Sequence, residues 1–150
     1  MAKFKYRMQN ILNIKYKLEE QAKTEFMLAN QHLQEEEKKL EQLQLRKREY
    51  EEVVRQLLMN TLQMDRIKEN REAVERMEEF IQVQNICVRD AKKQVEIKAA
   101  KLQEVMQERK AQEKLKEKSF EIFLQEENAK ESKEIDELVS FTYGKRRREE

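Results

Sequence analysis

The sequence predicts an all-α fold, a long antiparallel two-helix coiled coil, or helical hairpin, with its turn near residues 60–70. The chain of 150 residues has no proline and a single glycine, and 42% of its residues are charged. Glycine and proline are the strongest helix breakers and turn formers, so their scarcity excludes most sheet folds. The hydrophobic content of 38% is low for a globular core but sufficient for the narrow apolar seam of a coiled coil.

The first helix is expected over about residues 3–62, because an apolar seam recurs there in steps of four and three. Two consecutive steps of four, at Leu18–Ala22–Phe26, predict a stutter that locally unwinds the supercoil. Continued to the turn, the predicted seam positions are Phe4, Met8, Ile11, Lys15, Leu18, Ala22, Phe26, Ala29, Leu33, Glu36, Leu40, Leu43, Lys47, Tyr50, Val54, Leu57, Thr61 and Met64.

The turn is predicted within Asn60–Asn70, which contains two asparagines, a threonine and an aspartate. These residue types cap helices and bend chains where glycine is absent. Asn70 or Asp65 is expected as the N-cap of the second helix. A continuous helix through this segment is the alternative.

The second helix is expected over about residues 71–142, with a seam that loosens after residue 105 and a polar gap from Gln125 to Glu134. Gly144 is expected just beyond its end, where glycine is the usual residue. The basic tail 144–150 is expected to fray in solvent, with contact to nucleic acid or anionic lipid as the alternative. The predicted seam positions are Val74, Met77, Ile81, Gln84, Val88, Ala91, Val95, Ala99 or Lys98, Leu102, Val105, Ala111, Leu115, Phe120, Phe123, Leu124, Ile135, Leu138 and Phe141.

Opposite charge blocks favour a monomeric antiparallel hairpin. Residues 1–17 carry five basic and no acidic side chains, whereas residues 121–137 carry seven acidic and two basic ones. A fold near residue 69 lays the two blocks side by side, whereas a parallel homodimer would juxtapose like charges. Phe4, Met8 and Ile11 recur at helical spacing among the N-terminal cations, so a membrane-surface helix is the alternative for this segment.

The chemistry-bearing residues are too few for an enzyme. His32 is the only histidine, Cys87 the only cysteine, and a phosphate-binding loop cannot be built with one glycine. His32 and Glu36 stand four residues apart, but two ligands rarely suffice for a metal site. We therefore expect no catalytic, cofactor or metal site, and neither a small-molecule substrate nor nucleic acid as a partner. Cys87, in an apolar run, is expected to be a small buried hydrophobe in a reducing cytosol.

Three segments resemble the flagellar FliJ protein family. They are Phe4–Leu12 with Ile14–Glu20, the charged run Glu108–Lys118, and the acidic ending from Glu127 to Leu138. The resemblance implies a coiled coil similar to the central stalk of rotary ATPases, acting without catalysis in the flagellar type III export apparatus that motility requires. A basic membrane-surface adaptor and a generic coiled-coil scaffold or chaperone are the alternative functions.

The resemblance also implies the partners, which are the export ATPase, the cytosolic domain of the export-gate membrane protein, and export chaperones. The expected location is the cytoplasm, peripherally associated with the inner membrane at the flagellar base. Positions matching the family's gate-binding surface are Leu43, Tyr50 and Phe80. Phe80 precedes the seam residue Ile81 and so points about 100° away from it, which predicts an exposed aromatic ring. The chain departs from the family's pattern at Lys39, Arg46, Gln84, Cys87 and Ala91.

Overall fold

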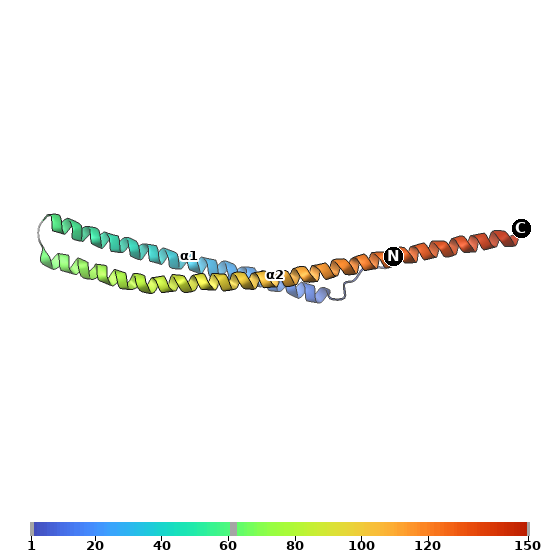
Figure 1. The fold of residues 1–150 in the computed structure, drawn as a ribbon, viewed down its shortest axis with the longest axis horizontal. Helices are drawn as coiled ribbons and strands as arrows, with labels where there is room; N and C mark the ends of the chain where they lie inside the picture. Colours follow the sequence, from blue (N-terminus) through green and yellow to red (C-terminus); the bar gives the residue numbers. More distant parts are fainter. Residues whose placement is uncertain (1, 61–62, 150) are drawn as a thin grey trace. The chain divides into compact units, whose positions relative to one another are not determined.

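The computed structural model describes residues 2–60 and 63–149, which form two α-helices (Figure 1). Helix α1 spans Gln9–Met59 and helix α2 spans Met64–Glu149, with no strand in the described ranges. The two helices run antiparallel and pack against each other, so the predicted helical hairpin is confirmed. The chain reverses between Met59 and Met64, within the predicted interval.

Helix α1 begins at Gln9 rather than near residue 3. The cations Lys3, Lys5 and Arg7 precede it, and positive charge disfavours a helix N-terminus. The non-helical segment instead carries Tyr6 to α2, where its hydroxyl donates to Oε1 of Gln112 at 2.9 Å. The predicted helix end at residue 62 and the predicted seam position Thr61 lie outside the described residues.

Helix α2 begins seven residues before the predicted start at residue 71, and neither proposed N-cap occupies that position. Asp65 lies in the first turn, where its carboxylate suits the positive end of the helix dipole. Asn70 lies inside the helix, and its Nδ2 donates to the backbone oxygen of Arg66 at 2.7 Å. Gln63 immediately precedes the helix, and its backbone oxygen accepts from the Ile67 nitrogen at 3.1 Å.

Helix α2 also continues past the predicted end at residue 142, and Gly144 lies within it. The expectation that Gly144 ends the helix is therefore wrong. A glycine inside a helix costs only about 1 kcal/mol relative to alanine. Arg146, Arg147 and Arg148 occupy the last turn, where cations favour the negative end of the helix dipole.

The chain divides into two compact units, which we describe separately. The turn unit comprises Glu20–Glu104, and the terminal unit comprises Met1–Glu19 with Val105–Glu150. In the turn unit, the predicted α1 seam from Ala22 to Leu57 is buried or half-buried at every position. Met77, Val88 and Ala91 of α2 are buried in the same unit. The heptad pattern therefore located this part of the interface correctly.

In the terminal unit, α1 presents a different face from the predicted one. Leu12 is 1% exposed and Glu19 is buried, whereas Ile11 and Leu18 are exposed. The buried and half-buried positions follow one another in alternating steps of four and three, at Met8, Leu12, Lys15, Glu19 and Ala22. The predicted stutter is therefore wrong. The burial of a glutamate explains the error, because the pattern was built on apolar residues.

The α2 seam also differs in this unit. Ala111 and Leu115 are exposed, whereas Arg109, Gln112 and Lys116 are half-buried. The seam of the terminal unit is therefore partly polar, and this explains why its apolar pattern is irregular.

The register of the hairpin does not follow the two charge blocks. Glu25 pairs with Lys98 at 3.4 Å, and Lys47 pairs with Glu78 at 3.4 Å, so the midpoint between partners falls near residue 62 rather than 69. In the terminal unit, Lys15 of the basic block pairs with Glu108 at 2.9 Å, outside the acidic block. The expected pairing of residues 1–17 with residues 121–137 is therefore wrong.

A distance measurement within the turn unit tests this register. We expect spin labels at Arg46 and Glu79, in a chain carrying Cys87→Ala, to be close together in one molecule. Labels at Arg46 and Lys92, the pairing that a fold about residue 69 requires, should be about 20 Å farther apart along the helix axis. A shorter distance for the second pair would contradict the register.

Candidate functional site

The three residues predicted to bind the export gate all lie in the turn unit, on two helices. Leu43 and Tyr50 are half-buried seam residues of α1, whereas Phe80 of α2 is 54% exposed. The expected exposure of the Phe80 ring is therefore confirmed. Because Lys47 pairs with Glu78, Phe80 lies level with Leu43. Tyr50, seven residues further along α1, lies about 10 Å closer to the turn.

Phe80 has an exposed apolar neighbour on the same side of α2. Val83 follows it by three residues, a spacing that places side chains next to each other, and is 61% exposed. Cys87 follows at seven residues and is half-buried rather than buried as expected. Ala91 is buried in the seam. We call Leu43, Tyr50, Phe80 and Val83 the turn-unit patch.

Two polar seam residues form a direct contact beside this patch. The Gln84 side-chain amide donates to both the backbone oxygen and the carboxylate of Glu36. This hydrogen bond is the main reason that the pKa of Glu36 lies below its ordinary value, with Lys39 at 3.5 Å adding to the effect. The carboxylate is thereby held charged inside the interface.

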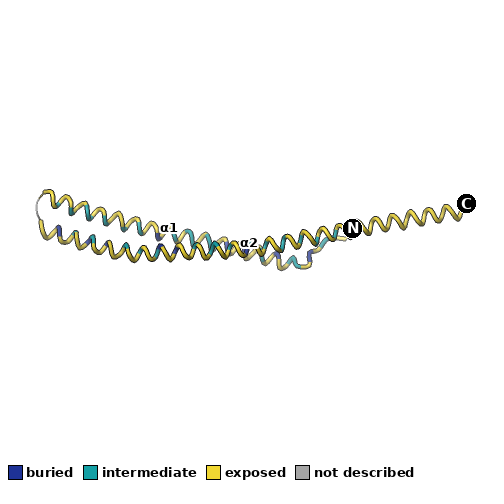
Figure 2. The backbone as a smooth tube through the Cα atoms, viewed as in Figure 1, coloured by how far each residue is buried: buried dark blue, intermediate teal, exposed yellow. Residues whose placement is uncertain are grey.

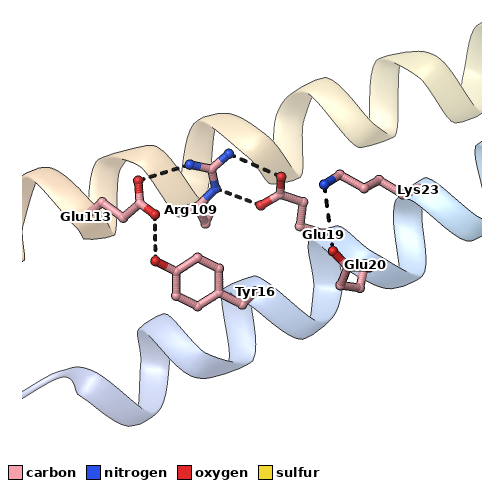
Figure 3. A network of polar contacts seen from close by, with 6 residues as sticks. All are labelled: Tyr16, Glu19, Glu20, Lys23, Arg109 and Glu113. Atoms are coloured by element: carbon pink, nitrogen blue, oxygen red, sulfur yellow. Dashed lines mark hydrogen bonds and ion pairs between the residues drawn. The ribbon is translucent and has the colours of Figure 1, made fainter.

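The terminal unit contains a larger polar network that crosses the interface (Figure 3). Arg109 of α2 donates from Nε and Nη2 to both carboxylate oxygens of Glu19, at 2.7 and 3.2 Å. Its Nη1 donates to Glu113 at 3.0 Å, and Glu113 also accepts from the Tyr16 hydroxyl at 2.6 Å. The guanidinium thus satisfies a buried carboxylate in two-point geometry, which is the strongest form of this contact.

The same network shifts the protonation of its members. The hydrogen bond from Tyr16 lowers the pKa of Glu113, and Arg109 lowers it further. The reciprocal contact raises the pKa of Tyr16. Both changes favour the native arrangement of an ionised carboxylate beside a protonated phenol.

An aromatic cluster lies in the same unit. The Phe4 ring meets Phe120 edge-on at 5.1 Å between centroids and Phe123 at 5.4 Å. These separations are those preferred by aromatic pairs. They hold the non-helical N-terminal segment against α2.

The metal-ligating residue types are dispersed along the described part of both helices. Across residues 2–60 and 63–149, no three His, Cys, Asp or Glu side chains come together to hold a metal ion. His32 lies 4.0 Å from Glu36, whose carboxylate already contacts Gln84 and Lys39. Neither helix, over its described length, carries an apolar stretch long enough to cross a bilayer.

A model of one protein family, described as flagellar FliJ protein, matches residues 4–148. The chain belongs to the FliJ family. Membership makes it a component of the flagellar export apparatus with its partners in that apparatus, and the family is a non-catalytic one. No curated protein and no solved structure matches the chain.

Sequence reasoning missed the polar networks of this FliJ family member. Tyr16, Glu19, Arg109 and Glu113 were not singled out, because a seam was sought among apolar residues. One signal was available for the smaller contact, since Glu36 and Gln84 are polar residues at seam positions on opposite helices. The larger network required the correct register before its members could be matched.

We expect the hairpin to lose stability in acid through Glu36 and Glu113. In the folded state, the pKa of each of these carboxyls lies below its ordinary value of 4.5. On acidification, the unfolded chain therefore binds a proton at each carboxyl before the folded chain does. The contribution of the two carboxyls to the free energy of unfolding is therefore present above pH 4.5 and is lost as the pH falls below it. Urea unfolding midpoints measured between neutral pH and pH 3 should decline in this window. A variant with Glu36→Gln and Glu113→Gln should decline less, and an equal decline would contradict the assignment.

Proposed function

We propose that this protein couples the export ATPase ring to the export gate and escorts export chaperones. In this proposal, the turn-unit patch binds the cytosolic domain of the gate protein, and the terminal unit binds the ATPase. The protein acts in the cytoplasm, peripherally associated with the inner membrane at the flagellar base. Membership of the FliJ family supports a role in the flagellar export apparatus, and the exposed ring of Phe80 supports the contact with the gate protein.

The exposure of Phe80 is the observation that carries this proposal. The seam around it is supplied by Met77, Ile81 and Val88, which are buried or half-buried, so the hairpin does not need Phe80 for packing. A large aromatic side chain left in solvent beside Val83 forms an apolar surface. Exposed aromatic residues of this kind are common anchors of protein interfaces.

The terminal unit supports the second contact in a different way. The segment before α1 is held to α2 by Tyr6 and by the rings of Phe4, Phe120 and Phe123. Ile11, Ile14 and Leu115 nevertheless remain exposed in this unit. It therefore offers apolar surface from both helices, which suits a partner such as the ATPase ring.

The same contacts argue against the N-terminal membrane helix. Residues 2–6 are not helical, and Tyr6 and Leu12 are buried within the terminal unit. An interfacial helix requires its apolar face to be free for lipid. Phe4 and Met8 of that face are half-buried inside the protein, and the residues before Gln9 do not form the helix that it requires.

We expect Phe80→Ala to weaken binding to the gate protein's cytosolic domain by about 30-fold, as for truncation of an interface hot spot of about 2 kcal/mol. Swimming motility should fall with it, while helicity and thermal unfolding stay close to the parent values. Ile97→Ala is the matched control, because Ile97 is 56% exposed on α2 at a distance from the patch. Binding that survives Phe80→Ala while the hairpin melts earlier would show that Phe80 is a packing residue and overturn the site.

A further inference from the structure

The C-terminal stretch of α2 is exposed along its whole described length. Every residue from 128 to 149 is exposed, and the tube in Figure 2 is yellow to its end. The stretch nevertheless contains large apolar side chains, among them Phe141, which is 72% exposed. The others are Ile135, Leu138, Val139 and Tyr143.

Most of these apolar side chains gather on one side of the helix, whereas Phe141 lies outside that face, beside Ser140 and Gly144. Ile135, Leu138, Val139 and Thr142 follow the spacing of three, four and seven residues that defines one helical face. Tyr143 borders this face, and a shallow groove there is lined by Leu138, Val139, Thr142, Tyr143 and Arg146. At about 100° per residue, the opposite side carries Glu137, Ser140 and Gly144. The segment is therefore amphipathic although it packs against nothing in the described chain.

A dense positive charge directly follows the apolar face. Lys145, Arg146, Arg147 and Arg148 are consecutive, and no acidic residue occurs from Leu138 to Arg148. The Arg147 guanidinium lies over the Tyr143 ring, 5.8 Å from its centroid. Aromatic rings, aliphatic side chains and cations thus occupy one short helical segment.

We propose that residues 135–148 of α2 form an interfacial helix that binds the surface of an anionic lipid bilayer. Helices that lie in a bilayer surface combine an apolar face with basic residues that contact lipid phosphates. Clusters of four or more Lys or Arg residues on such a helix are typical of anionic lipid binding. The proposal is independent of the gate contact, and it uses a stretch of the terminal unit other than the surface of Ile11, Ile14 and Leu115 offered to the ATPase.

The extent of the apolar face favours lipid over another helix. It covers about two turns, between the polar stretch 125–134 and the four cations. A coiled-coil partner requires a heptad pattern sustained over about three or four heptads. A bilayer surface needs no matching heptads, and its negative charge is complementary to the cations at 145–148.

Sedimentation of the full chain with vesicles tests the proposal. We expect binding to vesicles of phosphatidylglycerol and phosphatidylcholine in equal parts, much weaker binding to phosphatidylcholine alone, and a decrease with added salt. The variant with Arg146→Gln, Arg147→Gln and Arg148→Gln should bind about 100-fold more weakly. The variant with Lys3→Gln, Lys5→Gln and Arg7→Gln removes the same charge from the other end and should bind like the parent.

A fluorescent reporter locates the contact, because the chain has no tryptophan. Emission of a Val139→Trp chain should shift to shorter wavelength with the anionic vesicles, whereas that of an Ile97→Trp chain should not. Absence of vesicle binding, or equal losses in the two charge variants, would overturn the proposal. Concentration-dependent self-association that Leu138→Ser abolishes, without vesicle binding, would assign the face to a second copy and also overturn it.

Discussion

The seam between α1 and α2 is the interaction on which the rest of the structure depends. Isolated helices are marginal in water, and most helical stability in proteins comes from packing one apolar face. Here the packing is supplied by a narrow row of side chains such as Leu12, Ala22, Met77 and Ala91. The remaining surface is free to carry the charged residues that make up 42% of the chain.

Polar contacts within the seam determine which residues face each other. A uniform apolar seam tolerates a shift of one heptad, because every position then meets a similar one. Arg109 can satisfy the buried Glu19 carboxylate only in the observed alignment, and the same holds for Gln84 with Glu36. A shifted alignment would leave buried charged or polar groups without these hydrogen bonds, at a considerable cost. The register therefore follows from a few specific pairs rather than from overall charge.

The accuracy of sequence-based prediction varied along the chain for the same reason. The absence of proline and the heptads from Ala22 to Leu57 were sufficient to predict the hairpin and its interface in the turn unit. Phe80 was correctly predicted to be exposed, because an adjacent residue, Ile81, belonged to a regular seam. Leu12 and Glu19 were missed because Ile11 and Leu18 offered a more apolar alternative, and the burial of Glu19 depends on Arg109, 90 residues away. Gly144 was misplaced because a glycine that ends a helix and one tolerated inside it look alike in a sequence.

The central claim is that the α1–α2 seam stabilises the helices and that α2 beyond residue 127 lies outside it. Amide hydrogen exchange of the full chain, followed by mass spectrometry, tests this claim most directly. Peptides from residues 67–123 should exchange slowly, whereas those from residues 128–149 should exchange much faster, as for a helix with no packed face. Equally slow exchange through residue 149, in a chain that sediments as a monomer, would contradict the account.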